Sequence, residues 1–391
     1  MPDRASGVAA RDEPDYSCRR FNDLGPGELD EWQALCDSDP GQSSPLLGPE
    51  FAALVAGERE DVRILTARRG GALVGLLAVH KRPFGHARPI GAPFCDYCGP
   101  LLAPGEALSL PDMLAAGGLS SYHAPAAVVP PERLGDVSVE AEDHAFVIRL
   151  DGLAPEAYLE TFRARHAKRH KNFRRLLRQL ERGEDGEPKL AWGVPETDNL
   201  ATLLAWKSAQ FLGDGLLDVT AAPNSAKILK AAAALEPADS NALQGFMVSL
   251  TLGNTLLAGH FGVRRGEHFH PWIAAYNPEY GEYAPGILLI YKAIAMMDQM
   301  GLQSIDLSGG HDHYKKYFAA PLKPTWNIRA RAQGAQQGGV TLQRAAWRLA
   351  GAGRENAIAA RLRRRLDHIA ACEPALTGRV GQFVTALRKR S

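Results

Sequence analysis

The chain has 391 residues, of which 45% are hydrophobic and 23% are charged, and its formal net charge is +1. This composition is typical of a globular protein with buried cores, and the near-neutral charge excludes a general attraction to nucleic acid or membranes. The length exceeds one ordinary core, so we expect two domains and a tail. The N-terminus lacks the apolar stretch of a signal peptide, and no apolar run is long enough to span a membrane. We therefore expect a cytoplasmic protein.

The cysteines give no sign of a disulfide framework, because there are five of them, spread along the chain. Cys95 and Cys98 form a CxxC pair, but a zinc site would need a second ligand pair at a suitable spacing, and none stands out. Gly99 and Pro100 follow directly, so the pair does not open a helix as a thioredoxin-like redox site would. We expect ordinary reduced thiols and no metal site.

The first half of the chain predicts a mixed α/β domain at residues 15–150, after a disordered start that ends at about Pro14. Its clearest feature is a hairpin of two β-rich runs joined by Gly70 and Gly71, a strong two-residue turn signal. The predicted elements are short helices at 30–34 and 49–56 and strands at 62–69, 72–82, 126–130 and 145–150.

The second half predicts another α/β domain at residues 151–337 and a basic, helical tail at 338–391. Pro155 opens a long helix with one apolar face, which ends at Gly183. Glycine-containing dipeptides separate three later strand-like runs into a meander of hairpins. The predicted elements are helices at 155–182, 199–211, 224–234 and 285–300 and strands at 189–194, 243–252, 255–265, 268–277 and 304–309.

A possible binding site lies where the third strand of this meander gives way to a helix that begins with Pro285 and Gly286. The free N–H groups and the dipole of a helix start favour phosphate binding. Gly286 would let a bulky anion approach the backbone closely. Proline in the first helical turn is also common without any ligand. On this feature alone, a purely structural helix start is the alternative.

Four segments, in the same order, resemble the GNAT-superfamily acetyltransferases of the cellulose-biosynthesis CelD-like type, which are related to the FemAB tandem GNAT proteins. The first is the Arg-rich helix that opens the second half, and the third is the helix start at Pro285. The second segment matches a Trp-Lys-x-x-Gln motif at Trp206, Lys207 and Gln210. The fourth matches a signature, with His311 inserted, at Asp306, Leu307, Gly310, Asp312, Tyr314 and Lys315. The match spans about residues 151–330.

The resemblance implies an α/β (α+β) fold of tandem GNAT-like domains, each a mixed, largely antiparallel sheet flanked by helices. It also implies acetyl-CoA or another acyl-CoA as co-substrate and no other cofactor, and the sequence shows no metal site. The pyrophosphate would be bound by Ala284, Pro285, Gly286 and Ile287. Ala284 stands where the family more often has serine, which would remove one hydrogen bond to the ligand. The acceptor would be bound by Trp206, Lys207, Gln210, Asp312 and Lys315.

Direct transfer from a thioester to an amine needs an oriented thioester, a donor for the developing oxyanion and a route for the amine's proton. The candidates for that route are His260, His270, Asp306 and Tyr314. Histidine has the pKa nearest neutrality, although a structural role accounts equally well for each histidine. Asp306 could orient the amine or cap a loop, and Lys315 could bind the acceptor or belong to a solvated turn. Water relays are a further route.

One segment is strongly basic: nine arginines and lysines lie between Arg163 and Arg182. A solvated helix face is the usual meaning of such a run. Contact with an anionic acceptor, such as a nucleotide sugar or a polyprenyl-phosphate-linked sugar, is one alternative. Nucleic acid is another, although only Phe162 and Phe173 interleave the basic residues.

The leading hypothesis is an acyl-CoA-dependent N-acyltransferase that acts on a small-molecule or lipid-linked amine, such as an amino sugar of a surface-polysaccharide precursor, without nucleic acid. A FemAB-like aminoacyl-tRNA-dependent transferase ranks below it, because no sustained heptad indicates that group's coiled-coil arm. A catalytically inactive GNAT-fold scaffold is the third hypothesis. We expect the first domain to bind no cofactor and its loop at 93–100 to line an acceptor cleft between the domains. Association with a membrane surface or a biosynthetic complex stays open.

Overall fold

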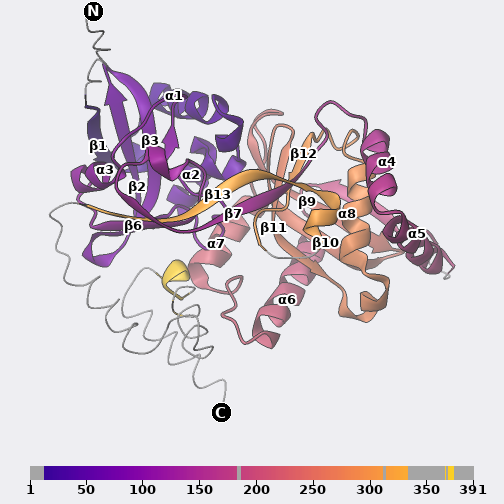
Figure 1. The fold of residues 1–391 in the computed structure, drawn as a ribbon. Coiled ribbons are helices and arrows are strands. Elements are labelled where there is room, and N and C mark those ends of the chain that lie inside the picture. The colour runs from indigo at the N-terminus through magenta and orange to yellow at the C-terminus, as the bar shows by residue number, and fades with distance from the viewer. Residues whose placement is uncertain (1–12, 183–185, 311–313, 333–365, 367–368, 374–391) are drawn as a thin grey trace, which may run out of the picture.

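The computed structural model describes residues 13–182, 186–310, 314–332, 366 and 369–373. The predictions of a disordered start and of a basic helical tail therefore lie almost entirely outside the described residues. Figure 1 shows the N-terminal half in indigo and violet beside the C-terminal half in pink and orange, with long strands running between them.

The N-terminal half contains the predicted hairpin, formed by β2 (Val62–Arg69) and β3 (Ala72–Lys81). Gly70 and Gly71 have φ values of 57° and 86°, as a turn with two left-handed residues requires. Both predicted helices exist and are longer than expected. The other elements are β1 (Asp15–Arg19), α1 (Pro26–Asp37), α2 (Pro49–Glu58), β4 (His86–Pro89), β5 (Leu101–Leu102), α3 (Leu110–Ala116), β6 (Ser121–Ala127) and β7 (Val137–Arg149).

The C-terminal half follows the predicted order of elements closely. Its helices are α4 (Pro155–Arg165), α5 (Ala167–Glu181), α6 (Thr197–Gly213), α7 (Pro223–Ala233), α8 (Pro285–Ala295) and α9 (Lys315–Phe318), with a 3-10 segment η6 (Pro278–Tyr283) before α8. Its strands are β8 (Lys189–Gly193), β9 (Leu243–Leu252), β10 (Thr255–Arg265), β11 (His268–Tyr276), β12 (Ser304–Asp306) and β13 (Ala320–Arg331). Helix α8 ends earlier than predicted, and β13 was not predicted.

The single helix predicted at 155–182 is wrong, because the chain breaks it into α4 and α5 at His166, whose φ and ψ are −131° and 43°. The break lets aromatic rings from both helices pack face to face. Phe162 of α4 stacks on Phe173 of α5 with the ring centroids 5.9 Å apart, and on Phe318 at 5.2 Å. The apolar spacing runs through the break without interruption, so the pattern alone indicates one helix.

The thirteen strands of the described residues belong to one sheet, with the order β1-β2-β3-β4-β6-β13-β7-β12-β11-β10-β9-β8 and β5 paired to β3. The last strand in the sequence, β13, therefore lies between β6 and β7 of the N-terminal half. Strand β7 in turn pairs with β12 of the C-terminal half. The two predicted sheets are joined through these strands. The assignment of 15–150 and 151–337 as separate domains stays a prediction.

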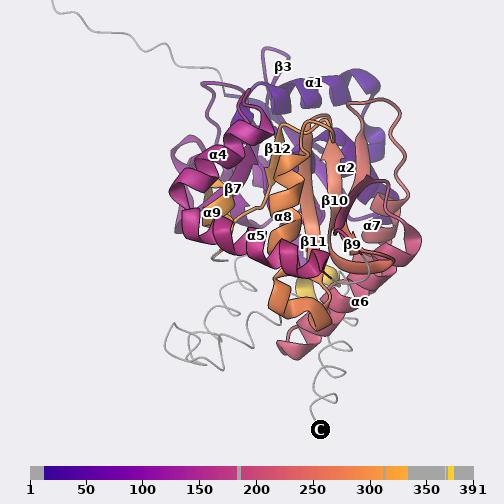
Figure 2. The same ribbon diagram turned by 90° about the vertical axis from the view of Figure 1, so that its right-hand side faces the viewer.

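The two faces of the sheet bury different cores around β11 and β12. Phe269 and Ile305 belong to the core beneath α4, α5 and α8, and Figure 2 shows these helices in front of the strands. Because side chains alternate along a strand, His270 and Asp306 face the opposite side, toward the N-terminal half. This side of the sheet carries the candidate site.

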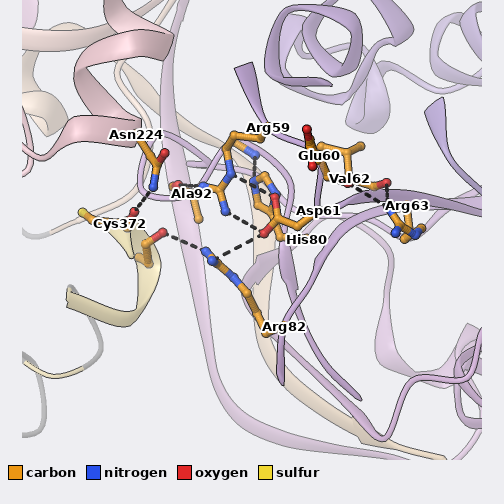
Figure 3. Close-up of polar contacts among 12 residues, drawn as sticks. Arg59, Glu60, Asp61, Val62, Arg63, His80, Arg82, Ala92, Asn224 and Cys372 are labelled. Atoms are coloured by element: carbon orange, nitrogen blue, oxygen red, sulfur yellow. Dashed lines mark hydrogen bonds and ion pairs between the residues drawn. The ribbon is translucent and has the colours of Figure 1, made fainter. Parts of the chain in front are cut away.

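A buried polar cluster in the N-terminal half surrounds Asp61 (Figure 3). Its carboxylate accepts a hydrogen bond from Arg59 at 2.8 Å and lies 2.9 Å from Nδ1 of His80 and 3.4 Å from Arg82. Burial disfavours the charged carboxylate, but hydrogen bonds and charges from His80 and Arg59 hold the pKa of Asp61 well below its usual range. Burial also lowers the pKa of His80 to about 4. His80 is therefore neutral, donating to Asp61 through Nδ1 and accepting from the Gly91 N–H at 3.0 Å through Nε2.

This cluster ties the described part of the tail to both halves (Figure 3). Arg82 donates to the carbonyl oxygen of Ala371 at 2.9 Å. Asn224 of α7 donates to the carbonyl oxygen of Cys372 at 3.0 Å. Two carbonyls at the end of a short helical segment are thereby satisfied by side chains from different halves.

We expect Arg82→Met to lower the free energy of unfolding by about 1–3 kcal/mol, because it leaves the Ala371 carbonyl without its donor and removes a positive charge 3.4 Å from the Asp61 carboxylate. Urea unfolding measures the change. Arg63→Met is the matched control. Arg63 donates only to the nearby carbonyls of Glu60 and Val62, so we expect less than about 0.5 kcal/mol. Equal losses of unfolding free energy in the two variants would show that the contact between Arg82 and Ala371 does not stabilise the protein.

Candidate active site

The sheet opens between β11 and β12. These parallel strands are paired only at His268 with Ser304 and at Phe269 with Ile305. Strand β12 ends at Asp306, whereas β11 continues to Tyr276 while paired on its other side with β10. Beyond Phe269, therefore, no described strand pairs with this edge of β11. Backbone groups on this edge can bind another molecule there, except the Ala274 carbonyl, which accepts a hydrogen bond from Lys207.

A β-bulge shapes the unpaired part of β11. Phe261 pairs with Ile273 and Gly262 pairs with Pro271, so Trp272 is an extra residue on β11. The backbones approach so closely that a Cβ atom at Gly262 would lie 2.0 Å from the carbonyl oxygen of His270. Only glycine permits this approach. The bulge therefore depends on one residue of the neighbouring strand.

The helix α8 starts directly beyond this edge. Ala284 precedes it in the left-handed conformation, at φ 50° and ψ 52°, which is uncommon for a residue with a side chain. Pro285 has no N–H, and the N–H groups of Ala284 and Ile287 donate to Gly281 and Ala284. The Gly286 N–H thus remains without an acceptor among the described residues. A Cβ atom at Gly286 would have Tyr276 as its nearest neighbour, at 3.8 Å, which is an ordinary van der Waals distance.

Two of the predicted catalytic residues, His270 and Asp306, meet on the other face of the opening. The parallel register, extended by one residue, places Asp306 opposite His270. Nδ1 of the fully buried His270 lies 3.8 Å from Oδ2 of Asp306, an ion-pair distance that is too long for a hydrogen bond. Nε2 lies 2.9 Å from Oδ2 of Asp96. Since each ring nitrogen faces a carboxylate, the geometry favours the imidazolium form, in which both nitrogens carry protons.

Tyr97 and Lys323 complete this network, and a backbone N–H supports it. The Tyr97 hydroxyl lies 2.7 and 2.8 Å from the two carboxylate oxygens of Asp306 and donates to that carboxylate. The Ser308 N–H donates to Asp306 Oδ1 at 2.8 Å. Lys323 of β13 holds its ammonium group 4.0 Å from the centroid of the Tyr97 ring. We refer to Asp96, Tyr97, His270, Asp306 and Lys323 together as the interface network, because both halves of the chain contribute to it.

The pKa values in the interface network follow from burial and charge. Burial opposes protonation of His270, but the neighbouring carboxylates of Asp306 and Asp96 outweigh it and raise the pKa of His270 to about 9. Burial likewise opposes ionisation of Asp306, but His270, Lys323 and Tyr97 outweigh it and lower the pKa of Asp306 to about 2. Burial and the Asp306 charge raise the pKa of Tyr97 well above its usual value. At neutral pH the network therefore holds an imidazolium, a carboxylate and a neutral phenol.

The raised pKa of His270 predicts a loss of stability in mild alkali. A group whose pKa rises on folding contributes stability that is complete below its unfolded value, near 6.5, and is lost as pH rises through about 9. We expect the free energy of unfolding to fall by up to about 1.4 kcal/mol per pH unit in this window. Urea unfolding at several pH values measures the slope. His270→Gln is expected to reduce it, and equal slopes in the two proteins would contradict the assignment.

The predicted residues Lys207, Gln210 and His260 form a separate group beside α6. Lys207 donates to Gln210 Oε1 at 3.1 Å and to the Ala274 carbonyl of β11 at 3.4 Å. His260 is buried, and burial together with the charge of Lys207 lowers its pKa to about 4. His260 is therefore neutral and does not join the interface network. Trp206 packs against the core that α6 shares with the N-terminal half.

The loop after β12 has a structural anchor. Lys315 is buried, and its ammonium group donates to the Gly309 carbonyl at 2.5 Å. Tyr314 packs against the core beneath α8. Asp312, which was also predicted to bind substrate, lies outside the described residues. The described residues also contain no group of three or more histidine, cysteine, aspartate or glutamate side chains arranged to hold a metal.

Sequence reasoning missed Asp96, Tyr97 and Lys323 as functional candidates. Asp96 and Tyr97 lie within the CxxC loop, where only the thiols had been considered. All five cysteines are free in the structure, and Cys98 is buried. The loop at 93–100 had been singled out only as the expected wall of an acceptor cleft. In the structure this loop places Asp96 beside His270 and Tyr97 beside Asp306. Its aromatic neighbour Phe94 stacks on Trp272 with the ring centroids 5.6 Å apart.

The sequence comparison supplies a family for the central part of the chain. Residues 167–316 match the family model described as acetyltransferase (GNAT) domain. This segment of the C-terminal half is therefore similar to a GNAT acetyltransferase domain. This segment holds the opening between β11 and β12, the start of α8, and His270 and Asp306. No curated protein gives a significant match to the chain.

Several solved structures are similar to this chain over most of its length, at low sequence identity. A crystal structure of FemX shares 11% identity at a TM-score of 0.50, covering 79% of this chain and 97% of that one. A tandem GNAT protein from the clavulanic acid biosynthesis pathway shares 11% identity at a TM-score of 0.45, covering 83% and 100%. The C-terminal domain of a putative lysylphosphatidylglycerol synthetase from Agrobacterium fabrum shares 9% at 0.47, covering 82% and 95%. The predicted class, mixed α/β with a largely antiparallel sheet between helices, is confirmed.

Proposed function

We propose that the chain is an acyl-CoA-dependent N-acyltransferase, with acetyl-CoA or a longer acyl-CoA as donor and an amine as acceptor. The observation that carries the proposal is the opening between β11 and β12. It connects the start of α8 on one face of the sheet with the interface network on the other. A thioester placed in this opening would have its phosphates on one side and its reactive carbon within reach of the other.

The donor site in this proposal is built from backbone. The Gly286 N–H and the positive end of the α8 dipole bind the pyrophosphate, with Ala284, Pro285 and Ile287 around it. The unpaired edge of β11 offers N–H and C=O groups to the pantetheine arm and to the acyl carbonyl. An N–H aimed at the carbonyl oxygen stabilises the negative charge that develops when the amine attacks.

In the transfer step, the amine nitrogen bonds to the thioester carbon and the carbon–sulfur bond breaks, releasing CoA. His270 and Asp306 are poor general bases at neutral pH, because the first is already protonated and the second has a pKa near 2. We assign the interface network an electrostatic and positioning role, and the amine's proton leaves through water. Of the two histidines predicted as catalytic, His260 is the one that is neutral at neutral pH, because its pKa is about 4.

The acceptor in this proposal approaches from the side of the N-terminal half. Asp96 has 36% of its side chain exposed while it bonds to His270, and its carboxylate favours an amine. The resemblance to CelD-like proteins supports an amino sugar of a surface-polysaccharide precursor, free or lipid-linked. The second candidate is an aminoacyl-tRNA-dependent transferase, and the exposed basic face of α5 is the observation that favours it.

The test is the release of CoA thiol from acetyl-CoA with primary amines of several classes, such as glucosamine, lysine and spermidine. We expect release that depends on the amine, with the acetylated product identified by mass spectrometry. Acetyl-CoA binding without transfer would leave the donor site standing and would exclude these acceptors. Absence of both binding and transfer would overturn the acyl-CoA proposal, and charged tRNA would then be tested as the donor.

A further inference from the structure

Helix α5 forms the outer end of the C-terminal half. Figure 1 shows it at the edge far from the N-terminal half, and Figure 2 shows it crossing in front of α8. Phe173, Leu176 and Leu180 are buried against the core, at helical spacings of three and four residues. The apolar side of α5 is therefore fully used by the fold, and its other side faces outward.

The outward side of α5 is strongly basic. Six arginines and lysines lie within α5, Arg182 follows as its C-cap, and Glu181 is the single acidic residue of the helix, although the whole chain has a net charge of only +1. Lys171, Arg178 and Arg182 are exposed. Their spacings of seven and four residues place them on one stripe opposite the buried side chains. Helix α5 thus presents a local excess of positive charge on its exposed side.

The partner of this stripe must be anionic and extended. Fifteen residues of helix span about 22 Å, longer than the diphosphate of a single nucleotide. The aromatic side chains of the segment, Phe162 and Phe173, are buried, so none is placed to stack on nucleic-acid bases, as single-stranded RNA recognition requires. A helix that lies along the surface presents its charges to a flat partner. Clusters of four to eight basic residues on such a helix attract anionic lipid headgroups.

We propose that α5 docks the protein on an anionic membrane surface by charge alone. No described helix is both long and apolar enough to cross a bilayer. Because the apolar side of α5 is buried in the core, the helix binds lipid headgroups without inserting. The attachment is therefore reversible and sensitive to salt. It does not depend on the identity of the acyl donor, and it would bring the proposed site close to a lipid-linked acceptor.

The test is flotation of the full chain with vesicles of phosphatidylcholine alone or with about 30% phosphatidylglycerol. We expect binding only to the anionic vesicles at low salt, and its loss near 0.5 M salt, where the Debye length falls to a few ångströms (~4 Å). The triple substitution Lys171→Gln, Arg178→Gln and Arg182→Gln is expected to weaken the apparent affinity by at least about tenfold. The matched control removes three exposed lysines elsewhere: Lys81→Gln, Lys227→Gln and Lys230→Gln.

Each outcome decides the proposal. Binding that only the α5 triple substitution weakens would support it. No binding to anionic vesicles at low salt would overturn it, as would equal losses in the triple variant and its control. A gel-shift titration with unfractionated tRNA tests the other polyanion. If the α5 substitutions weakened tRNA binding and left vesicle binding unchanged, the basic stripe would be assigned to nucleic acid instead.

Discussion

Asp306→Ala is expected to lower the free energy of unfolding by about 3–5 kcal/mol, because it removes one partner from a buried ion pair. The carboxylate is only 13% exposed and faces His270, Tyr97 and Lys323. Without it, the imidazolium keeps only Asp96, and the nearby ammonium group of Lys323 loses the closest negative charge. Burial of uncompensated charge, rather than the loss of contact area, accounts for the size of the effect.

The conservative substitution Asp306→Asn separates charge from shape, since an amide can still accept a hydrogen bond from Tyr97. Asp306→Asn should lower the pKa of His270, which can be followed by NMR of the imidazole protons. Tyr97→Phe removes one hydrogen bond and no charge, so its expected cost is about 1–2 kcal/mol. If Asp306→Ala cost no more than Tyr97→Phe, the interface network would not be the ionic cluster described above.

Gly262→Ala is expected to destabilise the protein by more than about 4 kcal/mol or to prevent folding, because the new methyl group has no space. Its Cβ would lie 2.0 Å from the His270 carbonyl oxygen and 2.6 Å from Cα of Pro271. Both atoms belong to the backbone, so no side chain can move aside. The strands would have to separate at the bulge that shapes the opening.

Gly213→Ala is the control for this substitution. Gly213 lies at the end of α6 with no atom within 4 Å of an added Cβ, and alanine favours a helix. Thermal and urea unfolding of both variants measure the difference. A Gly262→Ala protein as stable as Gly213→Ala would show that β10 and β11 are not packed as closely as described.

The sequence predicted the elements whose signals are local. The strands β9 and β10 have the predicted bounds, because glycine dipeptides mark their ends and apolar residues fill them. The helices α7 and α8 begin at or next to a proline that could be read directly. Asp306 was recognised as a candidate because it belongs to the matched signature, and His270 because the pKa of histidine lies near neutrality.

Features that depend on distant contacts were not predictable in this way. Strand β13 contains Pro321 and Pro324, which argue against a strand inside a sheet, and the register shifts next to Pro321 show how the sheet accommodates this segment. The contact between Asp96 and His270 joins residues 174 positions apart, and no periodicity carries that information. Asp96 and Tyr97 looked like ordinary loop residues until the fold placed them beside β11.

The most direct test of the central claim is calorimetric titration with acetyl-CoA of the unmodified protein, Gly286→Ala and Gly286→Trp. Because a Cβ atom at Gly286 would meet no atom closer than 3.8 Å, the alanine variant should fold, and an unfolding transition like that of the unmodified protein checks that the tryptophan variant is folded. The account predicts one-site binding that alanine preserves and tryptophan weakens by at least about tenfold, or 1.4 kcal/mol. Absence of binding by the unmodified protein, or equal binding by Gly286→Trp, would contradict a donor site at the start of α8.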